Sequence, residues 1–314
     1  AMPALLSDSI PLSKDPAVNL RALRYFVTLA REGHFARAAD LCGITQPTLS
    51  DALAALEEEL GKRLVERDRR FVGLTAHGKA LLPWAQQIVA AQDGLLQSLG
   101  GGEGGLQGTM RLGVIPAAMA LIGPLCRTLT DMHPHITLSI TSLSAGEIAS
   151  GLAAFELDAG ISYAGSQAQA GAISVELRQE RFVFASASSA NIRPRAAMNW
   201  REAATYPLCL LDQGMQNRRI IDACFAWHKV TVAPRVTADT FVALMAMIET
   251  GSFATIIPEC HMELLRGLEW AHFMPMERRP ASGKVVLVVS DRKPVSDMAN
   301  AALVAARRVS GQAA

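Results

Sequence analysis

The sequence predicts an α/β protein in which an all-α winged helix-turn-helix domain and a long linker helix precede a larger domain of two Rossmann-like α/β units. Three observations predict this fold class. Two short helical patterns meet at a glycine within residues 35–61, heptad-spaced apolar residues recur over residues 75–99, and strand patterns alternate with helical patterns from residue 110 onward. The length of 314 residues suits two or three domains.

The domain boundaries that we predict follow these patterns. Residues 1–18 mix prolines with Ser and Asp, which is typical of a flexible N-terminal extension. The winged helix-turn-helix domain covers residues 19–76 and opens with an amphipathic helix that Asn19 is expected to cap. The linker helix with a glycine-rich hinge covers residues 77–105. The α/β domain covers residues 106–314, with a first subdomain at about 106–180 and 284–314 and a second at about 181–283.

The stretch FARAADLCGITQPTLSDALAALEEELG carries the helix-turn-helix pattern. Gly43 stands where the first helix has to stop, because glycine adopts positive φ at little steric cost. Thr45 is the expected N-cap of the second helix, and Pro47 suits its first turn. The second helix carries one apolar stripe, made of Leu49, Leu53, Leu56 and Leu60.

The opposite face of this second helix begins with hydroxyl and amide side chains, namely Gln46, Thr48, Ser50 and Asp51. Such groups bond to phosphate oxygens and base edges in the major groove. Five cations and two anions between residues 62 and 70 then give a local charge of +3, with Arg67, Arg69 and Arg70 in an expected β-hairpin wing. The alternatives are an ordinary αα-hairpin and a solvated turn.

The linker helix is expected from Thr75 to about Leu99. Its apolar residues Leu81, Ile88 and Leu95 are seven apart, which favours helix pairing between subunits, although a packed core helix gives the same pattern. The glycines at 100, 101, 102, 104 and 105 indicate a hinge, and no G-K-[ST] follows them, so this is not a phosphate-binding loop.

The rest of the chain reads as α/β. The segments MRLGVI, ITLSIT, LDAGIS, FVFAS, PLCLLD, ATIIP and KVVLVVS are expected strands, separated mostly by helical patterns. This alternation implies a parallel sheet in each unit, and the last helix is expected to return to the first unit.

Composition sets further limits. The net charge of +1 means that DNA affinity has to come from a local patch. The five cysteines are widely spaced without C-x-x-C, which disfavours a disulfide scaffold or a zinc site and suits a reducing compartment. We find no apolar run of membrane-spanning length and no signal peptide, so we expect a cytoplasmic protein that does not bind membranes.

The chain resembles the LysR-type transcriptional regulators from Asn19 to about Arg308. The segments NLRALRYFVTLAREGHF, ARAADLCGITQPTLSDALAALEEELGKRLVER and LTAHG follow the family pattern in order and spacing, and LGVIP, ELDAGIS and GSFATIIPE fit its effector-binding domain more loosely. His34, Asp51 and His77 depart from the family pattern. The departures concern individual base contacts and leave the fold unaffected.

The resemblance implies a regulator that binds double-stranded operator DNA and forms a homotetramer, a dimer of dimers paired through the linker helix. It also implies an effector domain like a periplasmic binding protein, with a cleft between two subdomains. The DNA-contacting residues that we expect from motif and resemblance together are His34, Arg37, Gln46, Pro47, Thr48, Ser50, Asp51, Arg67, Arg69 and Arg70.

Carried over from the family, the effector contacts fall at strand-to-helix junctions: Pro116, Ala117, Ser142, Leu143, Ser144, Gln213, Gly214, Gln216, Asn217, Thr240 and Phe253. Helix N-termini at such junctions favour small anions. Arg218 either adds charge there or is an exposed helix residue. The segment DQGMQNRRIID resembles regulators of one-carbon and formate metabolism, so a small carboxylate such as formate is our candidate effector, with no resident cofactor and no metal.

Three other functions fit the sequence less well. Some members of the family sense peroxide through a cysteine pair, but Gln216 stands at the first of those positions and Cys209 and Cys224 lie elsewhere, which disfavours a thiol-sensing regulator. An enzyme is disfavoured because G-x-S-x-G, H-E-x-x-H and a strand-linked G-x-G-x-x-G are missing. A ligand-binding protein without DNA binding would leave the N-terminal motif unexplained.

Overall fold

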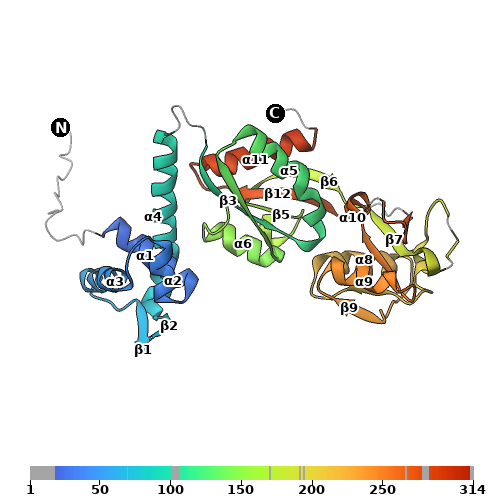
Figure 1. The fold of residues 1–314 in the computed structure, drawn as a ribbon, viewed down its shortest axis with the longest axis horizontal. Helices are drawn as coiled ribbons and strands as arrows, with labels where there is room; N and C mark the ends of the chain where they lie inside the picture. Colours follow the sequence, from blue (N-terminus) through green and yellow to red (C-terminus); the bar gives the residue numbers. More distant parts are fainter. Residues whose placement is uncertain are drawn as a thin grey trace, which may run out of the picture. The chain divides into compact units, whose positions relative to one another are not determined.

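The computed structural model describes residues 18–68, 70–100, 106–169, 171–190, 192–193, 195–265, 267–277 and 283–311. Within it the chain separates into two compact units, Ala1–Leu96 and Gln97–Ala314. Residues 1–17 of the predicted extension and residues 101–105 of the predicted hinge lie outside the described residues. Figure 1 shows the elements of both units along the chain.

The first unit opens with three mutually packed helices, α1 (Leu20–Glu32), α2 (Phe35–Leu41) and α3 (Gln46–Leu60). The expected caps are confirmed, because the Asn19 side chain accepts from Arg21 N and the Thr45 side chain accepts from Thr48 N. Gly43 has a φ of 66°, a left-handed conformation that a side chain would strain. The buried faces of the three helices form one core around Phe26, Leu49 and Leu53.

The wing consists of two antiparallel strands, β1 (Val65–Asp68) and β2 (Arg70–Leu74). Glu57 of α3 holds its base, since the carboxylate accepts from the backbone N–H groups of Leu64 (2.8 Å) and Val65 (3.0 Å). The long helix α4 (Ala76–Gly100) follows directly. Its Gly78 lies against the Leu64 backbone, where an added Cβ would come within 2.1 Å of the carbonyl oxygen.

The second unit contains a five-stranded sheet in the order β4-β3-β5-β12-β6. Its strands are β3 (Gly108–Val114), β4 (Ile136–Ser142), β5 (Ala159–Tyr163), β6 (Ala172–Gln179) and β12 (Lys284–Ser290). Helices α5 (Ile122–Met132) and α11 (Asp297–Val309) pack together on one face, and α6 (Ala145–Ala153) covers the other (Figure 1). The 3-10 turns η2 (Pro116–Leu121) and η3 (Gln167–Gln169) complete this part.

The other strands of this unit form a second group. Strands β10 (Ala254–Pro258), β7 (Phe182–Ala187) and β11 (Ala271–Pro275) form a three-stranded sheet, and β8 (Cys209–Leu211) pairs with β9 (Val236–Ala238). Helices α7 (Trp200–Ala203), α8 (Gln216–Trp227), α9 (Phe241–Glu249) and α10 (Glu259–Leu264) surround them, after the turn η4 (Ser188–Ala190). Buried Trp200 packs edge-on against Phe225, with ring centroids 5.1 Å apart.

The expectation of wholly parallel sheets was wrong. Strands β3, β4 and β5 are parallel, and so are β8 and β9, but β12 runs antiparallel to β5 and β6, and β7 runs antiparallel to β10 and β11. The antiparallel strands β7 and β12 are those that enter from the other sheet, at residues 180–181 and 283. No helix immediately precedes either strand. The rule that two strands joined by a helix run parallel therefore does not apply to them.

Candidate functional site

The first candidate site is the exposed face of the helix-turn-helix. Gln46, Pro47, Thr48 and Asp51 are exposed in the first turns of α3, and Ser50 is half-buried. The opposite face of α3 is buried in the core, so these side chains are the ones that α3 presents outward. The Thr48 hydroxyl already bonds to the Thr45 hydroxyl at 2.8 Å, which fixes its position.

The remaining predicted DNA contacts lie at the start of α2 and in the wing. His34 precedes the first turn of α2 and is exposed, and the exposed Arg37 donates to Glu32 at 2.8 Å. Arg69 lies outside the described residues. In the wing the backbone of Arg67 lies opposite Phe71 and that of Arg70 lies opposite Asp68, while the side chains of both arginines lie outside the described part. Lys62 and Arg63 are exposed beside the end of α3.

The second candidate site lies at the carboxyl ends of the parallel strands. Strands β3 and β4 end side by side, with Val114 opposite Ser142, and Leu143 N donates to Val114 O at 3.0 Å. Pro116, Ala117, Ser142, Leu143 and Ser144 therefore gather at one edge of the first sheet. The Ser144 side chain caps α6, and Glu147 completes a capping box with it.

The predicted residues of the second subdomain gather in the same way. Strands β8 and β9 end together, because Leu211 lies opposite Ala238 and Asp212 N donates to Ala238 O. Beyond that edge lie Gln213, Gly214, Gln216, Asn217 and Thr240. Phe253 is not among them, since it precedes β10, whose first residue Ala254 bridges in parallel to Leu208, before β8.

Side-chain contacts join these two edges. Asn217 of α8 donates through Nδ2 to the Tyr163 hydroxyl at 3.0 Å, and Tyr163 ends β5 of the first sheet. The Cys260 thiol lies 3.6 Å from the Ala117 carbonyl oxygen. The strand ends of the two sheets are therefore connected through packed side chains, and the predicted effector residues other than Phe253 lie around this junction.

The helices at this junction differ in their caps. Thr240 caps α9 by accepting from Ala243 N, as Ser144 caps α6. The N-cap position of α8 is Met215, whose side chain makes no capping bond. The first backbone N–H groups of α8 are consequently left to another acceptor, at the end of the helix where its dipole is positive.

Arg218 is held by contacts within its own subdomain. Its side chain is 1% exposed, and it donates to Asp222 Oδ1 and to the Leu211 carbonyl oxygen, both at 2.8 Å. The expectation of an exposed helix residue was therefore wrong. Asp222 belongs to α8 and Leu211 belongs to β8, so the guanidinium links this helix to this strand.

Sequence reasoning missed the buried polar groups at the junction. Tyr163 donates to Glu180 Oε2 at 2.6 Å, and both side chains are almost fully buried. Burial raises the pKa of Glu180 to about 7 and lowers that of buried His261 to about 4. In the sequence, Glu180 is one charged residue within the polar stretch RQER, and only the tertiary structure shows that Glu180 is enclosed.

The thiols of the second unit are in an apolar setting. Burial raises the pKa of Cys209 to about 11 and that of Cys260 to about 12, and it also raises the pKa of Cys126. A thiol with a raised pKa holds little thiolate at neutral pH, and thiolate is the form that reacts with peroxide. Within the described ranges, no group of three or more His, Cys, Asp or Glu side chains is arranged to hold a metal ion.

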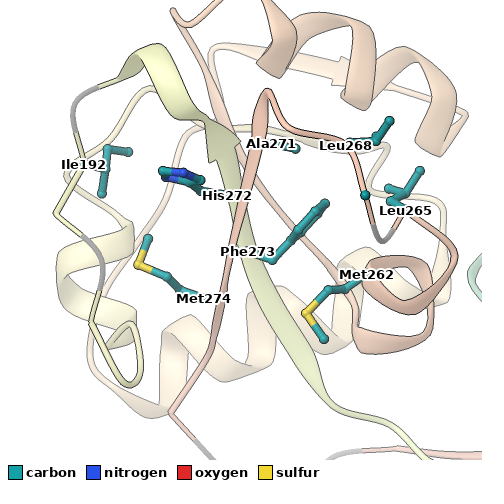
Figure 2. Close-up of a pocket in the computed structure, with 9 residues that line it drawn as sticks. Ile192, Met262, Leu265, Leu268, Ala271, His272, Phe273 and Met274 are labelled. Atoms are coloured by element: carbon teal, nitrogen blue, oxygen red, sulfur yellow. The ribbon is translucent and has the colours of Figure 1, made fainter.

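A separate apolar cavity of about 400 Å³ flanks strand β11 (Figure 2). Figure 2 shows Phe273, Met262 and Leu265 on one side of this strand and His272 with Met274 on the other. None of the predicted effector residues lines it. Among the described helices, none is long and apolar enough to cross a membrane.

Comparison with known proteins gives two family matches. The family described as "Bacterial regulatory helix-turn-helix protein, lysR family" matches residues 20–79, and "LysR substrate binding domain" matches residues 103–310. A probable hydrogen peroxide-inducible genes activator of Mycobacterium leprae is 32% identical over 242 residues, which cover 76% of this chain and 78% of that protein.

Solved structures show the same fold. A full-length OxyR variant from Pseudomonas aeruginosa superposes with a TM-score of 0.75 at 24% identity, covering 92% of this chain and 94% of that one. Full-length CbnR complexed with its target DNA gives a TM-score of 0.67 at 20% identity, covering 93% and 99% of the two chains. Both matches cover more than nine tenths of this chain, so the likeness in fold extends over both of its compact units.

Proposed function

The chain belongs to the LysR family of DNA-binding transcriptional regulators, and on that premise we propose that its larger unit senses a small molecule and thereby alters operator binding. The observation that carries this proposal is the uncapped N-terminus of α8, which lies at the carboxyl ends of β8 and β9 and is joined through Asn217 to the first sheet. A ligand held there contacts both subdomains, so it can favour one arrangement of them.

We propose the following organisation for this function. Residues 19–76 bind DNA, residues 77–105 pair subunits, and residues 106–314 hold the effector between subdomains at about 106–180 with 284–314 and at about 181–283. The exposed first turns of α3 read base edges while His34, Arg37 and the wing arginines contact the backbone of the DNA. A homotetramer built through α4 acts in the cytoplasm, where its operator is.

The effector that we propose is a small anion, with a carboxylate such as formate as the first compound to test. The free N–H groups and positive dipole end of α8 favour negative charge. Polar side chains at the same junction, Ser142, Gln213 and Gln216, are at least partly accessible. The hydroxyls of Ser144 and Thr240 cap helices, so they contribute to the site mainly by fixing α6 and α9.

The test introduces a negative charge where the anion is proposed to bind. Gln216→Glu places a carboxylate in the first turn of α8 and should weaken an anionic effector by repulsion. Ala223→Glu is the matched control, since Ala223 is an exposed residue of the same helix almost two turns further on. Binding to a fluorescent operator fragment is measured by anisotropy while sodium formate, and then other small carboxylates, replace chloride at constant ionic strength.

The expected result is a response in the parent and in Ala223→Glu that moves to higher carboxylate concentration in Gln216→Glu. Equal responses in all three proteins would place the effector elsewhere. No response of the parent to any carboxylate would contradict the proposed effector class while leaving DNA binding itself measurable in the same titration.

The second candidate function is peroxide sensing, and the names of the mycobacterial relatives favour it. The raised thiol pKa values of Cys209 and Cys260 argue for slow oxidation. Hydrogen peroxide at a concentration that oxidises a reactive sensor thiol within minutes should leave the thiols of Cys209 and Cys260 unoxidised and operator binding unchanged. Rapid loss of a thiol, with a change in DNA binding that a thiol reductant reverses, would favour the redox function over the anion sensor.

A further inference from the structure

A chain of three buried polar side chains crosses the junction between the two sheets. Tyr163 ends β5 in the first sheet, Glu180 lies in the segment that crosses to the second sheet, and Asn217 is in the first turn of α8. Tyr163 donates to Glu180 at 2.6 Å, and Asn217 Nδ2 donates to the Tyr163 oxygen at 3.0 Å. All three side chains are at most 3% exposed.

This chain of bonds has one loose end. Asn217 Oδ1 is buried and has no hydrogen-bond partner, which is costly for an amide oxygen. With Glu180 ionised, every bond points toward its carboxylate, so the amide has to present Nδ2 to Tyr163. If Glu180 gains a proton, it can donate to the Tyr163 oxygen, and the Tyr163 hydroxyl can then donate to Oδ1 after the amide rotates by half a turn. Protonation thus reverses the direction of the chain.

The surroundings of Glu180 leave its charge poorly compensated. Burial raises its pKa to about 7, against the bond from Tyr163, the nearby cation of Arg178 and a bond from the Arg181 backbone, all of which lower it. Arg178 is already paired with Glu259 (2.8 Å) and Glu263 (2.9 Å).

From α10, the Glu259 carboxylate raises the pKa of Glu180 further, and the Cys260 thiol faces the same group. Glu180 N also donates to Gly283 O at 2.8 Å, so the outgoing and returning crossing segments meet at this residue. The charged or neutral carboxyl group of Glu180 therefore lies at the point where both chain segments cross between the two sheets.

We propose that Tyr163, Glu180 and Asn217 form a proton-dependent latch, which holds the two subdomains together while Glu180 is neutral and loosens when Glu180 ionises. The ionised carboxylate gains far more hydration when the junction opens than the neutral acid does. The latch adds a pH input to the subdomain movement, and it operates in the absence of any effector.

Hydrogen exchange of the full chain, followed by mass spectrometry at about pH 6 and pH 8, tests the latch. The peptides of interest contain the crossing segment at Glu180 and the first turn of α8. With a pKa of about 7 when closed and the ordinary 4.5 when open, the opening equilibrium should rise roughly tenfold between these pH values. The parent is compared with Glu180→Gln, whose side chain is neutral at both pH values. The effects of pH on intrinsic exchange rates and on the other titrating groups then cancel in the comparison.

The expected result is the tenfold increase in the parent relative to Glu180→Gln. Glu176→Gln is the matched control, because it makes the same chemical change on neighbouring β6 at an exposed carboxylate that pairs with Lys284, and it should behave as the parent does. If the parent and Glu180→Gln change alike with pH, Glu180 does not control the junction and the proposal is wrong.

Tyr163→Phe tests the latch independently, in case the Glu180 variant folds poorly. It keeps the ring in its packed position but removes the donor that holds the pKa of Glu180 down. The pH at which the junction loosens should therefore move upward. If the pH midpoint of the loosening is the same in Tyr163→Phe as in the parent, Tyr163 is not part of the latch and the proposal is wrong.

Discussion

His261 should make the stability of the second unit depend on pH in a direction opposite to Glu180. His261 is 7% exposed and its ring lies tilted against Phe241 with centroids 4.1 Å apart, and burial lowers its pKa from 6.5 to about 4. The unfolded chain binds a proton near pH 6.5 while the folded chain does not, so stability is present above that pH and is lost as the pH falls toward 4. The difference between the two pKa values is worth about 3 kcal/mol at about 1.36 kcal/mol per pH unit.

Glu180 has the reverse sign. Its folded pKa is raised from 4.5 to about 7, so its contribution is present below pH 4.5 and is lost as the pH rises to about 7. Between about pH 5 and pH 6.5 the His261 contribution rises and the Glu180 contribution falls, each by about 2 kcal/mol, so the two changes nearly cancel in the parent. His261→Gln removes one of them, so its free energy of unfolding should fall by about 2 kcal/mol over that interval while the parent stays nearly flat.

Urea unfolding at several pH values in this interval, followed by tryptophan fluorescence, measures this difference. His272→Gln is the control, because His272 is exposed on β11 and should leave the slope of the parent unchanged. Glu180→Gln should show the opposite slope, with stability rising over the same interval. Parallel pH profiles for the parent and His261→Gln would refute the reasoning, since they would mean that the buried imidazole does not resist protonation.

Three further substitutions test other parts of the chain. Gly78→Ala should destabilise the first unit by several kcal/mol, on the order of the larger overpacking costs, because its Cβ would meet the Leu64 carbonyl oxygen, and a thermal scan of DNA-binding activity will detect this. Ile88→Asp should yield smaller oligomers in sedimentation, because Ile88 is a large apolar residue exposed on α4; unchanged sedimentation would place pairing elsewhere. Gln46→Ala with Ser50→Ala should reduce discrimination between operator and scrambled DNA by ~1–3 kcal/mol per lost base contact, whereas full discrimination would move base reading away from α3.

Local chemistry made the first unit predictable. The cap at Asn19, the positive φ at Gly43 and the leucine stripe of α3 each act over a few residues, so the sequence alone was enough to expect them. Gly78 shows the limit of this approach. Its small size is needed because α4 passes close to the Leu64 backbone, and nothing in the spacing of LTAHG indicates that approach.

The second unit was harder to predict because its strands change sheets. Strand β6 has one buried residue, Val175, and β11 has two buried residues, Ala271 and Met274, three positions apart, so neither presents a continuous buried run. The antiparallel strands follow from crossings at Glu180 and Gly283, which resemble ordinary turns in the sequence. The strand-to-helix junctions were predictable, since parallel pairs end at a common edge, and the exception, Phe253, precedes its strand.

The polar residues that connect the subdomains were unpredictable for a physical reason. A glutamate costs little on a surface and a great deal in an apolar junction, and the sequence does not say which environment Glu180 has. Its enclosure comes from Tyr163, the returning backbone at Gly283 and α10, all distant along the chain. A junction filled only with apolar side chains would hold its subdomains in one arrangement regardless of pH. Placing a titratable group there keeps the energies of two arrangements close, and a regulator that responds to a weakly interacting small molecule requires such a balance.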